Sequence, residues 1–256
     1  MSSRQLCPAL VSFWTDRFRV KLLYHRKLWE YVFICQALWE RGVLAPGMRG
    51  LGFGVGTEPL VSLFASSGCE VTATDMAPAE AEAIGWIGSL QHATNNDTLR
   101  WPAICEKDIF DENVTFMECD MNQVPSTLEG FDFCWSSCAL EHLGSIEHGL
   151  AFIIRSIDCL KPGGWAVHTT EFNLTSNEET VDRMDTVLFR KRDFEDLARR
   201  LAELGHKAAP FDFDPGVGQV DNYIDVPPFL NEPCLKIVLS GFATTSFGII
   251  VQRGES

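Results

Sequence analysis

The sequence has few basic residues. Its 256 residues include 21 Lys and Arg against 35 Asp and Glu, which gives a formal net charge of −14 at pH 7. A nucleic-acid surface needs clustered basic groups that displace counterions from the phosphates, and a strongly negative chain repels such a polyanion at long range. We therefore expect no DNA partner, regard RNA as disfavoured, and allow only a local basic pocket.

Long hydrophobic runs and paired cysteine motifs are also missing. No stretch approaches the roughly 18 uninterrupted apolar residues that a membrane span needs, and residues 1–17 lack the charged-then-apolar pattern of a secretion signal. The nine cysteines form no CxxC or CxxxC pair with a matching second half, so neither a zinc cluster nor a disulfide framework is predicted. We expect a cytoplasmic protein with no membrane partner, and the oligomeric state stays open.

The order of the predicted elements favours an α/β fold. Residues 9–41 carry apolar side chains at three- and four-residue spacings, which is typical of one or two amphipathic helices. Short apolar runs then alternate with helical segments, and this alternation implies a parallel sheet with helices on both faces. The predicted strands lie around Leu51 and at 71–74, 114–119, 131–135 and 165–170, and the predicted helices at 57–67, 78–92, 145–160 and 191–204.

The end of the chain predicts an antiparallel pair of strands. Two strand-like runs, 235–241 and 246–252, are joined only by Phe242 to Thr245, whereas a parallel crossover needs about a dozen residues or more. The prediction is a Rossmann-like, seven-stranded sheet that is mostly parallel and ends in this hairpin. We expect an N-terminal helical cap over residues 1–47 and a single domain over 48–256.

A glycine-rich turn follows the first predicted core strand. Glycine occupies alternate positions from Gly50 to Gly56 in RGLGFGVGTE. Glycine permits positive φ and lets backbone N–H groups approach a ligand, although a tight strand-to-helix turn uses the same residues without one. Two acids favour the ligand: Asp75 ends the second strand, where a doubly wound fold places an acid on a ribose, and Asp120 ends the third.

Taken together, these motifs resemble the class I S-adenosylmethionine-dependent methyltransferases. The resemblance covers residues 48–172, through GLGFGVG, the strand-end TD, ECDM, FDFCWSSCALEHL and LKPGGWAVHTTEF in that order. It implies S-adenosyl-L-methionine as cofactor, with the glycines at its methionine end, Asp75 at the ribose, Asp120 and Met121 at the adenine, and Ser136 near the sulfonium. The cofactor contacts predicted in this way are Gly52, Phe53, Gly54, Gly56, Asp75, Met76, Asp120, Met121 and Ser136.

One position departs from the family pattern. The family usually has an acidic residue two places before the first of these glycines, often in contact with the cofactor's amino group, and this chain has Gly50 there. We expect Glu58 to supply that carboxylate instead. A nicotinamide dehydrogenase is the rival interpretation, but glycines at 50, 52, 54 and 56 do not place the third glycine where helix packing demands it.

The acceptor side is predicted from the ends of the fourth and fifth strands. Methyl transfer requires alignment, and a neutral hydroxyl acceptor must also lose its proton. Glu141 and His142 follow the fourth strand, and His168 with Glu171 ends the fifth. We predict that these four residues form the catalytic cluster, with His142 or His168 as the base. The alternatives are a helix-start histidine bonded to backbone for His142 and a satisfied core histidine for His168.

The same segments resemble the metal-dependent sugar 2′-O-methyltransferases of small-RNA ends and the ubiquinone-pathway O-methyltransferases. Those families carry an ExxEH motif that holds a magnesium-like ion. Glu141 and His142 match its end, but Cys138 stands at the first glutamate position, and cysteine is a poor ligand for a hard cation. We therefore expect no metal and predict metal-independent acid/base assistance.

Acceptor specificity is predicted to depend on the variable segments. These are the N-terminal helices, the 77–113 insertion, in which Gly85-Trp86 and Gln91-His92 are candidates to line the pocket, and the long 206–234 loop. His25-Arg26-Lys27 either binds a phosphate or carboxylate of the acceptor or is a solvated helix face.

The sequence thus predicts an enzyme that O-methylates a small polar metabolite or a nucleotide-linked sugar. Two alternatives are a metal-dependent RNA-end enzyme and a non-catalytic module that only binds the cofactor. The stretch VPPF at 226–229 is similar to the [DN]PPY signature of DNA amino-methyltransferases, but it lacks the Asp or Asn and does not follow the fourth strand.

Overall fold

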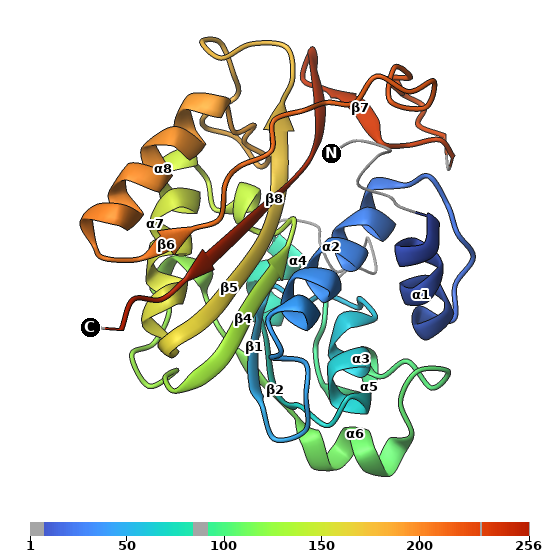
Figure 1. Cartoon of the computed structure of the whole chain (residues 1–256), viewed down its shortest axis with the longest axis vertical. Coiled ribbons are helices and arrows are strands. Elements are labelled where there is room, and N and C mark those ends of the chain that lie inside the picture. Colours follow the sequence, from blue (N-terminus) through green and yellow to red (C-terminus); the bar gives the residue numbers. More distant parts are fainter. Residues whose placement is uncertain (1–7, 84–91, 231, 256) are drawn as a thin grey trace.

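The structure of the chain, a computed structural model, describes residues 8–83, 92–230 and 232–255. These residues form an eight-stranded sheet with helices on both faces (Figure 1). The strand order is β3-β2-β1-β4-β5-β8-β6, and β7 pairs with β8 outside this path. The strands are β1 Arg49–Phe53, β2 Glu70–Asp75, β3 Val114–Glu118, β4 Phe131–Ser137, β5 Leu160–Asn173, β6 Lys207–Ala208, β7 Lys236–Leu239 and β8 Phe242–Gln252.

The helices follow the strands in the order that the alternating pattern predicts. The N-terminal pair, α1 and α2, is joined by the loop that precedes His25, whose side chain caps α2 by accepting a hydrogen bond from the Lys27 backbone. The α-helices are α1 Pro8–Phe18, α2 Arg26–Glu40, α3 Leu60–Ser66, α4 Pro78–Ala83, α5 Asn96–Leu99, α6 Lys107–Asn113, α7 Ile146–Asp158 and α8 Lys191–Glu203, with the 3₁₀ turns η3 Met121–Gln123 and η4 Leu140–His142. No helix among the described residues is long and apolar enough to cross a membrane.

The sheet confirms the predicted fold class but not the strand count. Strands β3, β2, β1, β4 and β5 pair in parallel, and β8 runs antiparallel to both β5 and β7. The described residues form eight strands rather than seven, because Lys207 and Ala208 pair with β8 as the short strand β6. Two residues are too few to show the alternation that marks a strand, so the sequence pattern predicted them as part of the 206–234 loop. Within the 77–113 insertion, α5 and α6 were also not predicted.

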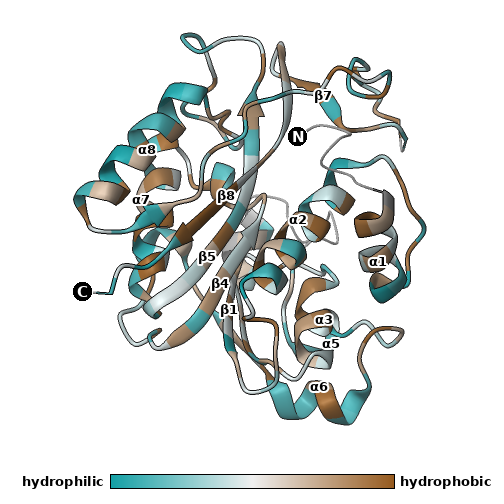
Figure 2. Cartoon of the chain, viewed as in Figure 1, coloured by the Kyte–Doolittle hydropathy of each residue, from teal (hydrophilic) through white to brown (hydrophobic). Residues whose placement is uncertain are grey.

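The two faces of the sheet have separate apolar cores. Phe133, Trp135 and Val167 pack with α1, α2 and α3, whereas Cys134 and Ala166, one residue away in the same strands, pack with α7 and α8. Successive strand side chains point to opposite faces, so alternating residues of β4 and β5 serve both layers. In Figure 2, α8 carries both teal and brown residues, and its buried apolar side chains are Phe194, Leu197 and Leu201.

Close packing explains why β1 carries two glycines. A Cβ at Gly52 would lie 2.5 Å from the Trp135 indole, and a Cβ at Gly50 would collide with the Phe133 ring. The acidic residue that the family usually has at position 50 therefore has no room here. Gly52 lies in the strand beneath Trp135, so its absence of a side chain is required by packing in the core.

We predict that Gly52→Ala destabilises the fold by about 1–3 kcal/mol, because the added methyl group overpacks a filled core. Chemical denaturation of the two proteins measures the change. Trp135→Phe removes the indole atoms that the methyl group would meet and leaves only Val55 Cγ1, at 2.5 Å, among its nearest neighbours, so the double variant should lose less stability than the sum of the two single variants. Strict additivity of the two losses would contradict this account.

Candidate functional site

A cavity of about 430 Å³ lies at the carboxyl edge of the parallel strands. Its walls come from the turn after β1, the turn after β4, the end of β5 and the beginning of α2. The predicted site residues that line it are Gly54, Gly56, Glu58, Glu141, His142 and Glu171. A wider groove of about 600 Å³ between the η3 turn and α7 is lined by none of the predicted site residues, so we do not treat it as the active site.

The glycine-rich turn forms one wall of this cavity. Gly54 and Gly56 adopt φ angles of +56° and +53°, which residues with side chains rarely adopt. A Cβ at Gly54 would lie 2.8 Å from Ala139 and 3.3 Å from the Met121 sulfur. The turn after β1 therefore packs directly against the turns after β3 and β4. Phe53, by contrast, faces the other layer, where its ring meets Phe152 edge to face.

Asp75 is fully engaged in holding this turn. Its Oδ2 accepts hydrogen bonds from the backbone N–H groups of Gly56 (3.0 Å) and Ala93 (3.2 Å), and its Oδ1 accepts one from Met76 (2.9 Å). Burial raises the pKa of Asp75, opposed by these hydrogen bonds and by His92, whose Nδ1 lies 3.3 Å from Oδ1. Neither Asp75 nor Met76 is among the described residues that line the cavity.

Asp120 and Met121 begin the turn after β3. The Asp120 side chain caps the turn, with Oδ1 accepting from the Asn122 backbone (2.8 Å) and Oδ2 from the Gln123 amide (3.1 Å). Met121 is buried against Gly54. The structure thus brings Met121 to the glycine turn but gives the Asp120 carboxylate local partners.

His168 lies in the core rather than in the cavity. Ser156 Oγ donates to the Ile153 carbonyl, so it accepts from His168 Nε2 (3.1 Å), and Ser136 Oγ donates to His168 Nδ1 (2.8 Å). Burial lowers the pKa of His168 to about 3, so the ring is neutral. This placement does not support the predicted roles of His168 as the base and of Ser136 at the sulfonium, because each satisfies the other inside the sheet layer.

Glu141, His142 and Glu171 do come together. Glu141 is buried, and its Oε2 accepts a hydrogen bond from the Thr170 hydroxyl (3.0 Å). His142 is half-buried, and its Nδ1 lies 2.6 Å from the Asp185 carbonyl oxygen. Because a carbonyl only accepts, this nitrogen carries the proton, and the lone pair of the neutral ring is on Nε2.

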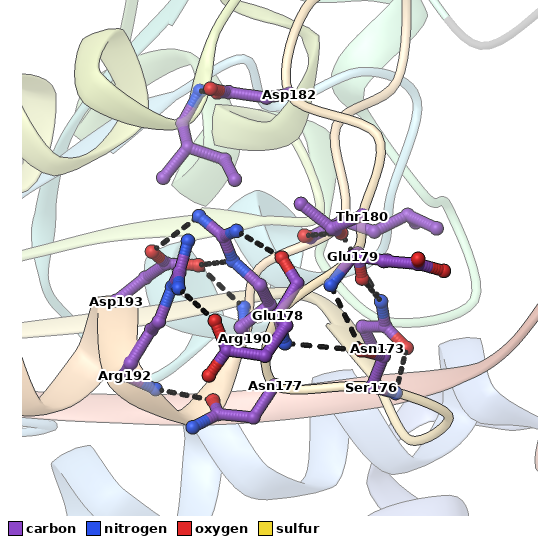
Figure 3. Close-up of polar contacts among 12 residues, drawn as sticks. Asn173, Ser176, Asn177, Glu178, Glu179, Thr180, Asp182, Arg190, Arg192 and Asp193 are labelled. Carbon is purple, nitrogen blue, oxygen red and sulfur yellow. Dashed lines mark hydrogen bonds and ion pairs between the residues drawn. The ribbon is translucent and has the colours of Figure 1, made fainter.

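The loop that holds His142 in place is itself well fixed. Residues 174–190 connect β5 to α8, and Asn173 anchors the start of the loop by accepting from the backbone N–H groups of Thr175 and Ser176 and donating to the Glu179 carbonyl. At the far end the Arg190 guanidinium binds Asp193 and the Glu178 carbonyl (Figure 3). The loop therefore presents Asp185 to His142 on an ordered backbone.

The beginning of α2 supplies two cations that the sequence left undecided. Arg26 forms an ion pair with Glu171, and the Lys27 ammonium lies 3.0 Å from Glu30 and 3.3 Å from Glu58. Burial by itself lowers the pKa of Lys27, but the two carboxylates outweigh it and hold the pKa well above its ordinary value. Arg26 and Lys27 thus line the cavity and do not form a solvated helix face.

The sequence analysis missed Glu30 as part of this network. Glu30 is fully buried; it accepts hydrogen bonds from Ser137 (3.2 Å) and Ser246 (2.5 Å), and the cations Lys27 and Arg26 lower its pKa against the effect of burial. A carboxylate between Trp29 and Tyr31 on an apolar helix was the available signal, because buried charges occur only where they are paired.

Burial raises the pKa of Glu58 to about 7, although Lys27 acts in the opposite direction. The Glu58 Oε2 atom is buried and accepts no hydrogen bond, so a donor from a bound ligand would satisfy it. These facts fit the predicted contact between Glu58 and the amino group of the cofactor.

Cys138 has an unusual backbone at the end of β4. Its φ is +47°, and its N–H donates to the carbonyl and the hydroxyl of Thr169 (3.0 and 3.1 Å). Ligand atoms of Cys138, Glu141 and Glu171 lie within 4.8 Å of one another, which is compact enough for a metal ion. Burial raises the pKa of the Cys138 thiol well above its ordinary value, and the Arg26 guanidinium already pairs with Glu171.

His92 and Asp225 are described residues that do not line the cavity. Gly85, Trp86 and Gln91 lie outside the described residues, and His92 is buried beside Asp75. In the long loop, Asp225 accepts hydrogen bonds from the backbone of Val226 (3.0 Å) and Leu230 (2.6 Å), so it shapes the loop.

Comparison with known proteins identifies a domain family for part of the chain. Residues 51–168 match the family model described as a methyltransferase domain. A search of curated proteins found no match. Residues 51–168 therefore have the features of an S-adenosylmethionine-dependent methyltransferase domain.

Several solved structures share the fold. A candidate sarcosine dimethylglycine methyltransferase from Galdieria sulphuraria is 13% identical and aligns over 96% of this chain and 99% of its own, with a TM-score of 0.55. The magnesium protoporphyrin IX methyltransferase of Synechocystis PCC 6803, with bound S-adenosylhomocysteine, is 13% identical over 96% and 97% of the two chains (TM-score 0.50). The TehB protein of Haemophilus influenzae is 12% identical over 86% and 62% (TM-score 0.50).

We predict that His168 makes the fold sensitive to acid. The ordinary histidine pKa of 6.5 applies to the unfolded chain and about 3 to the folded one, so the unfolded state binds the extra proton first. Stability is therefore lost as the pH falls below 6.5, by about 1.5 kcal/mol between pH 6.5 and pH 5. The free energy of unfolding of the wild type and of His168→Gln, measured by urea denaturation across this range, should differ in slope by that amount. Parallel slopes would rule the effect out.

Proposed function

We propose that this methyltransferase transfers its methyl group to a hydroxyl of a small polar acceptor. The observation that carries the proposal is the position of His142 in the same cavity as the glycine turn, with its proton fixed on Nδ1 by the Asp185 carbonyl. A histidine held in this tautomer offers Nε2 as a general base.

The cavity is the site that we propose for the cofactor. S-adenosylmethionine supplies an electrophilic methyl group on a sulfonium. We propose that the backbone of Gly54 and Gly56 contacts its methionine end, that Glu58 Oε2 accepts hydrogen bonds from its ammonium group, and that Met121 packs near its adenine. The absence of side chains at the two glycines and the unsatisfied Glu58 oxygen support this assignment.

On the acceptor side the chain's own groups have separable tasks. His142 Nε2 accepts the proton that the acceptor hydroxyl loses. Glu141 and Glu171, held by Thr170 and Arg26, orient the acceptor. The cavity volume must hold the reactive end of the cofactor as well as the acceptor, which favours a small acceptor molecule.

We also propose that no divalent metal takes part. The guanidinium of Arg26 already compensates Glu171, and a buried protonated thiol at Cys138 is a poor ligand for a hard cation. An RNA acceptor is disfavoured because the two permanent cations of the cavity, Arg26 and Lys27, are paired with carboxylates.

The first test follows labelled methyl groups from S-adenosylmethionine into a panel of small hydroxyl compounds and identifies the methylated atom by mass spectrometry and NMR. We expect O-methyl products, with His142→Gln lowering kcat about 10²–10⁴-fold through loss of the base. His148→Gln is the matched control, because His148 bonds the Leu143 carbonyl outside the cavity. Methyl transfer to nitrogen, or an equally active His142→Gln, would refute the proposal.

A second test uses the pKa of Glu58. The carboxylate is charged only above about pH 7, so the affinity for S-adenosylhomocysteine, which carries the same amino group, should rise by about tenfold between pH 6 and pH 8. Calorimetric titration of Glu58→Gln should give a flat profile, with affinity near the low-pH value of the wild type. Glu195→Gln removes an exposed charge on α8 and should keep the wild-type slope. A slope that survives in Glu58→Gln would exclude Glu58 from this contact.

A further inference from the structure

The ionisable groups in and around the cavity carry an excess of acid. Among the described residues, the basic side chains that line it are Arg26, Lys27 and His142, and the acidic ones are Glu58, Glu141 and Glu171. Glu30 lies directly behind Lys27 as a further buried carboxylate. Four carboxyl groups therefore share two permanent cations.

In the described part of the chain, the two cations leave two carboxyl groups without a charge partner: one of the pair Glu30 and Glu58, and Glu141. Lys27 lies between Glu30 and Glu58, so it compensates fully for only one of them, and Glu58 is the member proposed to meet the cofactor. Arg26 pairs with Glu171. Among the described residues no basic side chain lies within ion-pair distance of Glu141, whose Oε2 has the Thr170 hydroxyl as its partner.

Glu171 provides a second, independent indication of a missing ligand. It is 1% exposed and lines the cavity, yet its Oε2 atom accepts no hydrogen bond. The Arg26 ion pair reaches Oε1 and leaves Oε2 without a donor. A buried carboxylate oxygen without a donor is costly, so a ligand with N–H donors would be held strongly at this wall.

We propose that the acceptor carries a protonated amine next to its hydroxyl, and that Glu141 and Glu171 bind this ammonium group. The inference rests on the proposed function of the cavity and narrows the acceptor to cationic amino alcohols and amino sugars. Charge-assisted hydrogen bonds from an ammonium satisfy Glu171 Oε2 and compensate Glu141.

The geometry disfavours the opposite charge on the acceptor. A phosphate or carboxylate at Arg26 and Lys27, which the sequence pattern left open, would have to displace Glu171, Glu30 or Glu58 from buried ion pairs. Burial keeps the Cys138 thiol protonated, so it adds no charge to either side.

The experiment compares acceptors that differ only in one charged group. One set is glucosamine, glucose and glucuronate, and the other is 2-aminoethanol, ethylene glycol and glycolate. Their dissociation constants are measured by calorimetry at pH 7 with saturating S-adenosylhomocysteine. We expect the amine of at least one set to bind about tenfold or more tightly than its neutral partner, and the acid to bind most weakly.

Variants and a metal arm complete the design. Glu171→Gln and Glu141→Gln should each reduce the preference for the amine to less than about threefold, whereas Glu195→Gln on the α8 surface should leave it unchanged. Thermal unfolding checks that the variants are folded. Because two separate variants are used, the proposal can still be tested if one of them does not fold. The titrations are repeated with Mg²⁺ in place of the amine.

Each outcome decides the proposal. The proposal would be overturned by equal affinities within both sets or by no measurable binding of any member. It would also be overturned by a preference for the amine that survives in both Glu variants, or by Mg²⁺ that occupies the site in competition with the amine. Product analysis separates it from the proposed function. Methylation at nitrogen with the amine preference intact would refute O-methylation alone, whereas O-methyl products without that preference would refute the ammonium site alone.

Discussion

The burial of Glu30 is the constraint on which the active-site wall depends. A carboxylate with no solvent exposure is tolerated only when cations and donors surround it, and Lys27, Ser137 and Ser246 meet this need from α2, β4 and β8. Satisfying this one charge therefore fixes the beginning of α2 over the carboxyl edge of the sheet. Once the helix is held there, Arg26 and Lys27 necessarily face the cavity, and the N-terminal helices become part of the site.

The sequence predicted the fold class and the order of the elements because the signals were long and periodic. The glycine turn was also found, since Gly54 and Gly56 need positive φ, whereas Gly52 was grouped with them although the Trp135 ring accounts for it. Chain order alone does not separate a glycine that faces a ligand from one that lies under an aromatic ring. The two-residue strand β6 lay below the length at which alternation is visible.

The direction in which each side chain of β4 and β5 points, toward one face of the sheet or the other, decides which polar residues reach the cavity. Ser136 and His168 are register partners and point together toward Ser156 of α7, whereas Ser137, one residue later, bonds Glu30 on the opposite face. A shift of one residue exchanges the two faces of a strand. Because WSSC and VHTTE contain consecutive polar residues, the sequence does not show which serine or threonine faces the cavity. For this reason the sequence brought His142 and His168 together, and the structure separates them.

Cys138 connects the two halves of the site through its backbone. A residue with a side chain at φ +47° carries a conformational cost, which here is offset by two hydrogen bonds from its N–H to Thr169 of β5. The resulting turn directs the Ser137 carbonyl to Lys27 (3.4 Å) and places Ala139 against Gly54. Because the same peptide supports the glycine turn on one side and leads into Glu141 and His142 on the other, a change in its conformation would displace both halves together. The backbone conformation of Cys138 is therefore what matters at this position, and this role does not depend on whether the thiol contacts a ligand.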